Sequence, residues 1–236
     1  MSGDGSRTPA TRLRWGTRLA LFLVVVEAVL VRLGRTHGSW PGERAQRMPG
    51  DELIDRPDVR TDHAVTIHAP ASSIWPWLVQ MGWGRAGWYT ARWVDLLLFP
   101  ANGPSAMRTE PDLQQVELGT FIPDGPPESG CGFTVVGFDP ERSLVLRSRS
   151  HLPSSWRRHT AMDWTWAFVL TPLDEASTRL HVRSRWSTWP WWLTVGSRLG
   201  ILPADFLMSR DMLRGVKWRA ERARGPIAAQ EPDHVD

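Results

Sequence analysis

The chain has 236 residues, 42% of them hydrophobic and 22% charged, a composition typical of one globular domain with a buried core. It excludes a collagen, a disordered tail protein and a multi-pass membrane protein. A single cysteine, Cys131, excludes an intramolecular disulfide and a zinc site built from several cysteines. The formal net charge is +3, yet most of the excess lies in residues 1–48, and the rest of the chain is slightly acidic. Nucleic acid is therefore excluded as a partner, because the main domain lacks a surplus of basic side chains for phosphates.

The N-terminal region predicts a membrane anchor. Residues 1–18 are polar and rich in arginine, which predicts disorder, and residues 19–33 predict a hydrophobic helix. Its apolar centre is shorter than the roughly 20 residues that cross a bilayer. Extension to 13–33 reaches that length but includes Glu27 near the middle, which is unfavourable in lipid. We expect a membrane-associated protein with a single-pass or embedded anchor over 13–33 and a cytoplasmic domain. A helix packed on the domain and a signal peptide are the alternatives.

Residues 34–60 are rich in Gly, Pro and charge, which predicts a linker. The domain itself is expected over 61–224. It begins with a strand at 62–68, followed by helices at 74–81 and 90–99. The pattern then alternates with a period of two. This predicts five further strands, at 120–123, 132–138, 143–149, 162–170 and 177–186.

The last two strands and the last helix indicate how the layers face each other. Trp164, Trp166 and Phe168 share one face of their strand, so this face is expected to be buried. In the next strand the face of Arg179, His181, Arg183 and Arg185 is interpreted as solvent-exposed. A long helix over 203–224 has one apolar face, and the polar tail 225–236 is expected to be disordered.

Several stretches of this sequence carry a resemblance to a known superfamily. They are Val65–Met81, the following Gly-Trp-Gly-Arg-Ala-Gly-Trp-Tyr, 116–123, 165–170 and 178–183. With the order of elements, they resemble the START/birch-pollen-allergen-like (SRPBCC) superfamily, which includes polyketide cyclase/dehydrase and lipid-transport proteins, in a bacterial branch. The resemblance implies an α+β helix-grip fold, in which a curved antiparallel sheet wraps a long C-terminal helix around an apolar cavity. The N-terminal hydrophobic helix and the Trp-rich stretch 187–202 are additions to that fold.

The sequence shows no strong catalytic motif. The histidines do not pair at ligand spacing, and no Gly-x-Ser-x-Gly elbow is present. Residues 82–87 match Gly-x-Gly-x-x-Gly, but they follow a helix and so lack the strand that a dinucleotide site requires. We therefore expect no catalytic residues, no metal site and no cofactor.

The resemblance, strand parity and helix spacing together predict a cavity lining. Its residues are Trp88, Tyr89, Trp164, Trp166, Phe168, Ser184, Trp186, Ser209, Met212, Leu213 and Val216. The favoured function is binding, with transport as an extension, of a hydrophobic small molecule or lipid at or near a membrane. One alternative is a polyketide cyclase/dehydratase-like enzyme that uses Tyr89, Arg85 or Asp163. The other is a non-catalytic scaffold with a filled core. The identity of the ligand and the oligomeric state stay open.

Overall fold

The computed structural model describes residues 9–98 and 100–223. One antiparallel sheet holds six strands in the order β1-β6-β5-β4-β3-β2. The strands are β1 (Val59–Ile67), β2 (Phe121–Pro123), β3 (Gly132–Asp139), β4 (Ser143–Ser148), β5 (Ala161–Pro172) and β6 (Thr178–Trp189). The helices are α1 (Pro9–Thr36), α2 (Pro41–Ala45), α3 (Ala71–Val79), α4 (Arg92–Leu98), α5 (Trp191–Gly196) and α6 (Leu202–Ala223), with a π-helical turn, η4 (Ser197–Ile201), between α5 and α6. Short 3-10 turns are η1 (Asp51–Leu53), η2 (Pro111–Leu113) and η3 (Pro127–Ser129).

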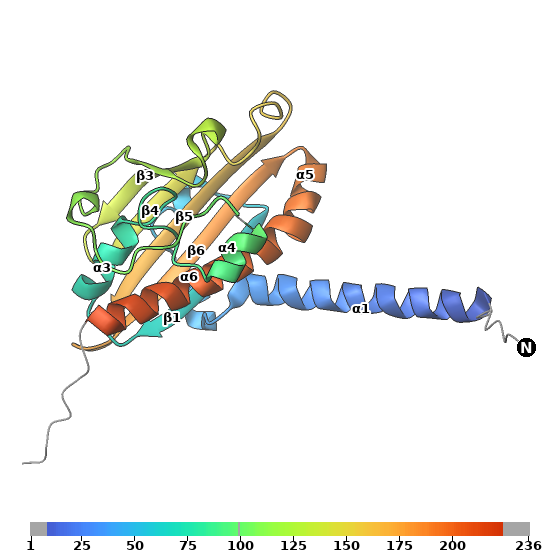
Figure 1. The fold of residues 1–236 in the computed structure, drawn as a ribbon, viewed down its shortest axis with the longest axis horizontal. Coiled ribbons are helices and arrows are strands. Elements are labelled where there is room, and N and C mark those ends of the chain that lie inside the picture. Colours follow the sequence, from blue (N-terminus) through green and yellow to red (C-terminus); the bar gives the residue numbers. More distant parts are fainter. Residues whose placement is uncertain (1–8, 99, 224–236) are drawn as a thin grey trace, which may run out of the picture.

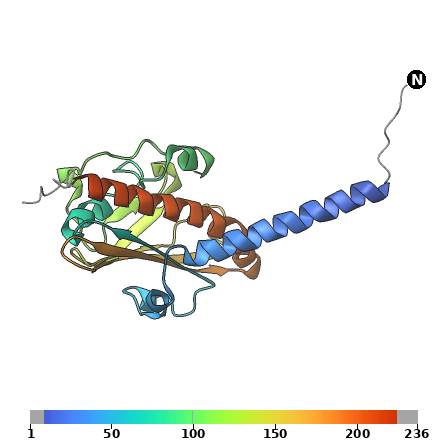
Figure 2. The same ribbon diagram turned by 90° about the horizontal axis from the view of Figure 1, so that it is seen from below.

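The long helix α6 lies across one face of the sheet (Figures 1 and 2). Alternate residues of β5 and β6 point to this face because side chains alternate along a strand, and they form the main core with α3 and α6. Trp166, Phe168 and Trp186 are fully buried there. This architecture confirms the predicted α+β helix-grip fold.

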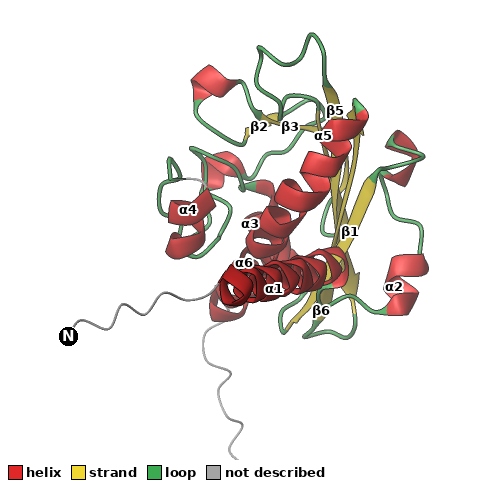
Figure 3. Cartoon of the chain, turned by 90° about the vertical axis from the view of Figure 1, so that its right-hand side faces the viewer, coloured by secondary structure: helices red, strands yellow, loops and turns green. Residues whose placement is uncertain are grey.

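The opposite face of the sheet is also covered, which corrects one interpretation from the sequence. Arg183 is only 1% exposed, and Arg179, His181 and Arg185 are buried too. Residues 39–58, with α2 and η1, pack over them on the side of the sheet away from α6 (Figure 3). The segment 34–60, predicted as a linker, therefore forms a folded layer over the sheet.

This outer layer is held by buried ion pairs. The Arg183 guanidinium donates to Asp62 at 2.7 Å and to Asp51 at 2.7 Å. Arg185 binds the other Asp51 oxygen at 2.6 Å. Burial alone would raise the pKa of Asp62, but hydrogen bonds, first from His181 and then from its arginine partners, outweigh it and hold that pKa below its ordinary value. The outer layer is thus fixed by charge pairing on the face of the sheet opposite the apolar face.

Helix α1 extends well beyond the sheet, and only its C-terminal part packs on the domain (Figures 1 and 2). Gly34 makes this packing close, because a Cβ there would come within 3.2 Å of the Leu202 carbonyl oxygen. Within residues 9–98 and 100–223, no helix combines the length and apolar character needed to cross a membrane. The predicted single-pass anchor over 13–33 is therefore wrong. The predicted membrane-associated localisation with a cytoplasmic domain depended on that anchor and is not supported. The physical reason is that Glu27 interrupts the apolar run and that arginines flank this run at both ends.

The ends of the chain differ in what the structure describes. Helix α1 begins at Pro9, inside the 1–18 segment that was expected to be disordered. Residues 1–8 and the tail 225–236, also expected to be disordered, lie outside the described residues.

Candidate functional site

An apolar pocket of about 350 Å³ lies between the start of β5 and the segment that joins α5 to α6. Met162 and Trp164 line it from the sheet, and Met208 lines it from α6. Its polar atoms come mainly from three side chains, Asp124, His151 and Asp205. Ligand pockets span about 300–1,000 Å³, with mostly apolar walls and a few polar groups, so this pocket has the expected character at the small end of the range.

Small residues at four-residue spacing explain why this end of the helix layer is hollow. Gly196, Gly200 and Ala204 all line the pocket, and residues four apart share a helix face; the larger Met208 follows at the same spacing. A Cβ built on either glycine meets nothing within 4 Å, so both border empty space. Farther along α6, large side chains such as Met212 and Leu213 fill the same space against the sheet.

Asp205 is a fully buried carboxyl group at the pocket wall. Burial raises its pKa to about 7, and hydrogen bonds from Thr61 and Ser209 only partly oppose this shift. Both contacts are long, at 3.4 Å, and neither partner carries a charge. Below neutral pH, Asp205 is therefore largely a neutral acid whose O–H is available to donate to an acceptor in the pocket.

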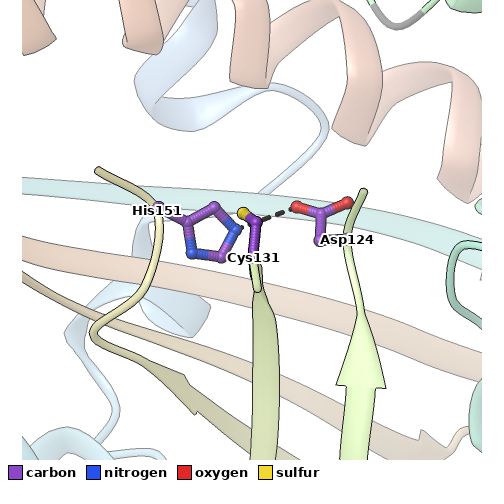
Figure 4. Close-up of side chains that lie close together, drawn as sticks. All are labelled: Asp124, Cys131 and His151. Atoms are coloured by element: carbon purple, nitrogen blue, oxygen red, sulfur yellow. Dashed lines mark hydrogen bonds and ion pairs between the residues drawn. The ribbon is translucent and has the colours of Figure 1, made fainter. Parts of the chain in front are cut away.

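Asp124 and His151 form a second polar group at the pocket (Figure 4). The His151 Nε2 atom lies 2.9 Å from the Asp124 carboxylate, and Nδ1 lies 2.6 Å from the Ser148 hydroxyl. The ring is also held by aromatic contacts with Phe133 and Trp164, whose centroids are 4.6 and 4.9 Å away. Both imidazole nitrogens are thus engaged by protein groups, and the ring orientation is fixed.

Cys131 joins this pair to make a group of potential metal ligands. One ligand atom each from Asp124, Cys131 and His151 lies within 4.8 Å of the others. Burial, and then the neighbouring Asp124 carboxylate, raise the pKa of the Cys131 thiol to about 12. These three residues show no ligand spacing along the sequence, because they come from three separate segments of the chain.

The structure places the eleven predicted cavity residues in different surroundings. Trp164 lines the pocket, with its indole N–H donating to the Ser184 hydroxyl at 2.6 Å. Ser209 reaches the pocket indirectly, through its contact with Asp205. Trp88 and Tyr89 are buried in the main core and also border two other hollows. The remaining residues fill the core between sheet and helix: Trp166, Phe168, Trp186, Met212, Leu213 and Val216.

The polar residues considered for an enzyme have structural partners instead. Tyr89 donates to the Trp77 carbonyl oxygen, and Arg85 donates to carbonyl oxygens at the end of α3. Asp163 points away from the core and pairs with Arg147 at 2.6 Å. None of the three lines the pocket beside Asp205.

Comparisons with known proteins found distant structural similarities. No family model and no curated protein matches the chain. Among solved structures, a hypothetical protein from Helicobacter pylori is 13% identical with a TM-score of 0.46, covering 75% of this chain and 96% of that one. The di-domain aromatase/cyclase BexL of the BE-7585A pathway is 17% identical with a TM-score of 0.41, covering 71% and 48%. The Zhui aromatase/cyclase from Streptomyces sp. R1128 is 18% identical with a TM-score of 0.37, covering 72% and 98%. At TM-scores under 0.5 and identities of 13–18%, these similarities carry no argument about the family, ligand or reaction of this chain.

Proposed function

We propose that this protein binds a compact hydrophobic molecule with one hydrogen-bond acceptor in the pocket between β5 and the α5–α6 segment. The observation that carries the proposal is an apolar hollow with a buried neutral carboxyl group, Asp205, in its wall. Apolar walls supply affinity in proportion to the area removed from water, and one directed polar group orients the ligand. A carbonyl or ether oxygen is the acceptor that fits a protonated carboxyl.

The size of the pocket narrows the ligand class that we predicted from sequence. A volume of about 350 Å³ favours a small molecule over a two-chain lipid. Transport of the ligand stays a prediction.

The hydrogen bonds of His151, the histidine that lines the pocket, favour binding over catalysis. A general base must reach the proton that it removes, within hydrogen-bond distance of the substrate. Both nitrogens of His151 are already held, by Asp124 and by Ser148. A cyclase or dehydratase would require that pair to open first. The scaffold alternative is supported by the filled centre of the core but leaves this hollow end without a role.

The proposal is tested by filling the pocket from α6. Ala204 is half-buried in the pocket wall, so Ala204→Phe places a ring in the hollow. Ala223→Phe, at an exposed position of the same helix, is the matched control. The probe is N-phenyl-1-naphthylamine, a neutral dye whose emission increases in apolar surroundings, titrated into each purified protein.

We expect one saturable site in the wild type and in Ala223→Phe, and at least a tenfold weaker site in Ala204→Phe with unchanged circular dichroism. Native mass spectrometry of protein purified from its own host then gives the mass of any bound molecule. A wild type without a saturable site, or an Ala204→Phe variant that binds the dye as tightly as the control, contradicts the proposal.

A further inference from the structure

Three side chains with different ligand atoms converge where β2, β3 and β4 end. Asp124 directly follows β2, Cys131 directly precedes β3, and His151 follows β4. The β2–β3 register pairs Pro123 with Gly132, and the Asp124 amide then donates to the Cys131 carbonyl oxygen at 2.9 Å. This hydrogen bond fixes the first two residues opposite each other on neighbouring chain segments. Figure 4 shows the His151 ring and the Asp124 carboxylate facing each other beside the Cys131 thiol.

We propose that Asp124, Cys131 and His151 form a transition-metal site of the zinc type, with one coordination position open beside the pocket. Carboxylate oxygen, thiolate sulfur and imidazole nitrogen are all zinc ligands, and a mixed set of three with an open fourth position is typical of non-structural zinc sites. Two of the three residues line the pocket, so the open position adjoins the hollow. This inference is independent of the proposed ligand.

The spacing of the ligand atoms is close to what a tetrahedral ion needs. Metal bonds of about 2.0–2.3 Å place tetrahedral ligand atoms roughly 3.3–3.8 Å apart. Here the three atoms lie within 4.8 Å of one another, so side-chain rotations that move the atoms by about 1 Å are sufficient. Binding would require the three side chains to turn and the hydrogen bond between His151 and Asp124 to open.

A chain of hydroxyl groups prepares His151 to be a ligand. Its Nδ1 contacts the Ser148 hydroxyl at 2.6 Å, which contacts the Ser150 hydroxyl at 3.2 Å, and that hydroxyl donates to the Gly132 carbonyl oxygen. In the metal-free protein Nε2 donates to the Asp124 carboxylate at 2.9 Å; an ion bound at Nε2 would leave the ring proton on Nδ1, and every donor in this chain of hydroxyl groups would then have an acceptor. Histidine ligands commonly donate their other ring N–H to such an outer partner, which fixes the tautomer.

Charge also favours a cation at this point, because the Asp124 carboxylate and the Cys131 sulfur lie within 4.8 Å of each other. A divalent cation would attract the carboxylate and the thiolate that forms when it displaces the thiol proton.

The test uses the full chain without a polyhistidine tag, stripped with a chelator and titrated with Co²⁺, a spectroscopic substitute for Zn²⁺. We expect one Co²⁺ per chain, with visible d–d bands of a tetrahedral ion and a near-ultraviolet thiolate-to-cobalt band, and we expect Zn²⁺ to displace it. Cys131→Ser should lose the thiolate band. His151→Gln should weaken binding by at least about tenfold, and Ser148→Ala, which removes the outer partner, by about tenfold.

The matched control is His159→Gln, which removes an exposed histidine outside the group and should leave the spectrum unchanged. If a variant fails to fold, X-ray absorption of the zinc-loaded wild type replaces it, with one sulfur expected among the scatterers. Absence of the thiolate band in the wild type, its persistence in Cys131→Ser, or a zinc shell without sulfur would overturn the proposal.

Discussion

Replacement of Asp205 by Asn is expected to stabilise the protein, and by more at alkaline than at acidic pH. Burial raises the pKa of this carboxyl from an ordinary 3.8 to about 7. Between those two values the folded state holds a proton that the unfolded state has released, so the free energy of unfolding falls as the pH rises. Three pH units at about 1.4 kcal/mol each give a loss of about 4 kcal/mol by pH 8. Asn is similar in shape and cannot ionise, so the variant avoids this loss.

The assay is guanidinium unfolding of wild type and Asp205→Asn at pH 5 and pH 8. At pH 8 the whole shift counts, whereas at pH 5 only about the first unit does, so the stabilisation should be about 3 kcal/mol larger at pH 8. Taking this difference cancels any change in hydrogen bonding that does not depend on pH. His63 acts in the opposite direction, since burial lowers its pKa to about 4 and stability is lost as the pH falls below 6.5, but it is common to both proteins.

Asp112→Asn is the control, because this carboxyl is exposed on η2. It should change stability little, and equally at both pH values. An Asp205→Asn variant that is stabilised equally at pH 5 and pH 8 would refute the reasoning, because Asp205 would then ionise in its ordinary range.

Two further substitutions test the packing of the domain. Gly215→Ala should destabilise the protein by about 1–3 kcal/mol, because the added Cβ would lie 2.0 Å from the Tyr89 carbonyl oxygen. Gly42→Ala, where a Cβ meets nothing within 4 Å, should be neutral. Equal unfolding midpoints of the two variants would contradict the close approach of Gly215 to Tyr89. Arg183→Met should cost about 3 kcal/mol in urea unfolding at pH 7, because it leaves the buried Asp62 and the half-buried Asp51 with fewer partners, while exposed Arg158→Met should cost little. A loss no larger than that of Arg158→Met would show that these ion pairs contribute nothing.

The sheet and the helix around which it curves could be predicted because their signals are local. Alternation along β5 places Trp164, Trp166 and Phe168 on one face whatever the rest of the chain does, and the structure has all three facing the core. The same alternation indicated only that Arg183 is on the other face. What covers that face depends on residues more than a hundred positions away, Asp51 and Asp62 among them, and no local pattern contains this information.

The candidate site was harder to predict for a related reason. Asp205 lies four residues before Ser209 and therefore on the same face of α6, so helical spacing could have identified it. Asp124, Cys131 and His151 have no regular spacing along the chain, and only the pairing of β3 with β2 and with β4 brings them together. The expectation that no acid–base or ligand group would face the cavity rested only on the spacing of residues along the sequence. That spacing does not reveal groups that strand pairing brings together.

The sizes of the side chains between the sheet and α6 determine where the pocket lies. In the centre of the core, the rings of Trp166, Phe168 and Trp186 occupy the space between the sheet and α6, so a ligand has no room there. Toward the α5–α6 junction, Gly200 and Ala204 replace bulky residues on the helix side, and the hollow opens. Binding is therefore expected at one end of the helix-grip core, and the same sheet end carries the three potential metal ligands. A ligand in the pocket should consequently change the fluorescence of Trp164, which lines the hollow, and a metal bound to His151 should do so as well, because the two rings are in contact.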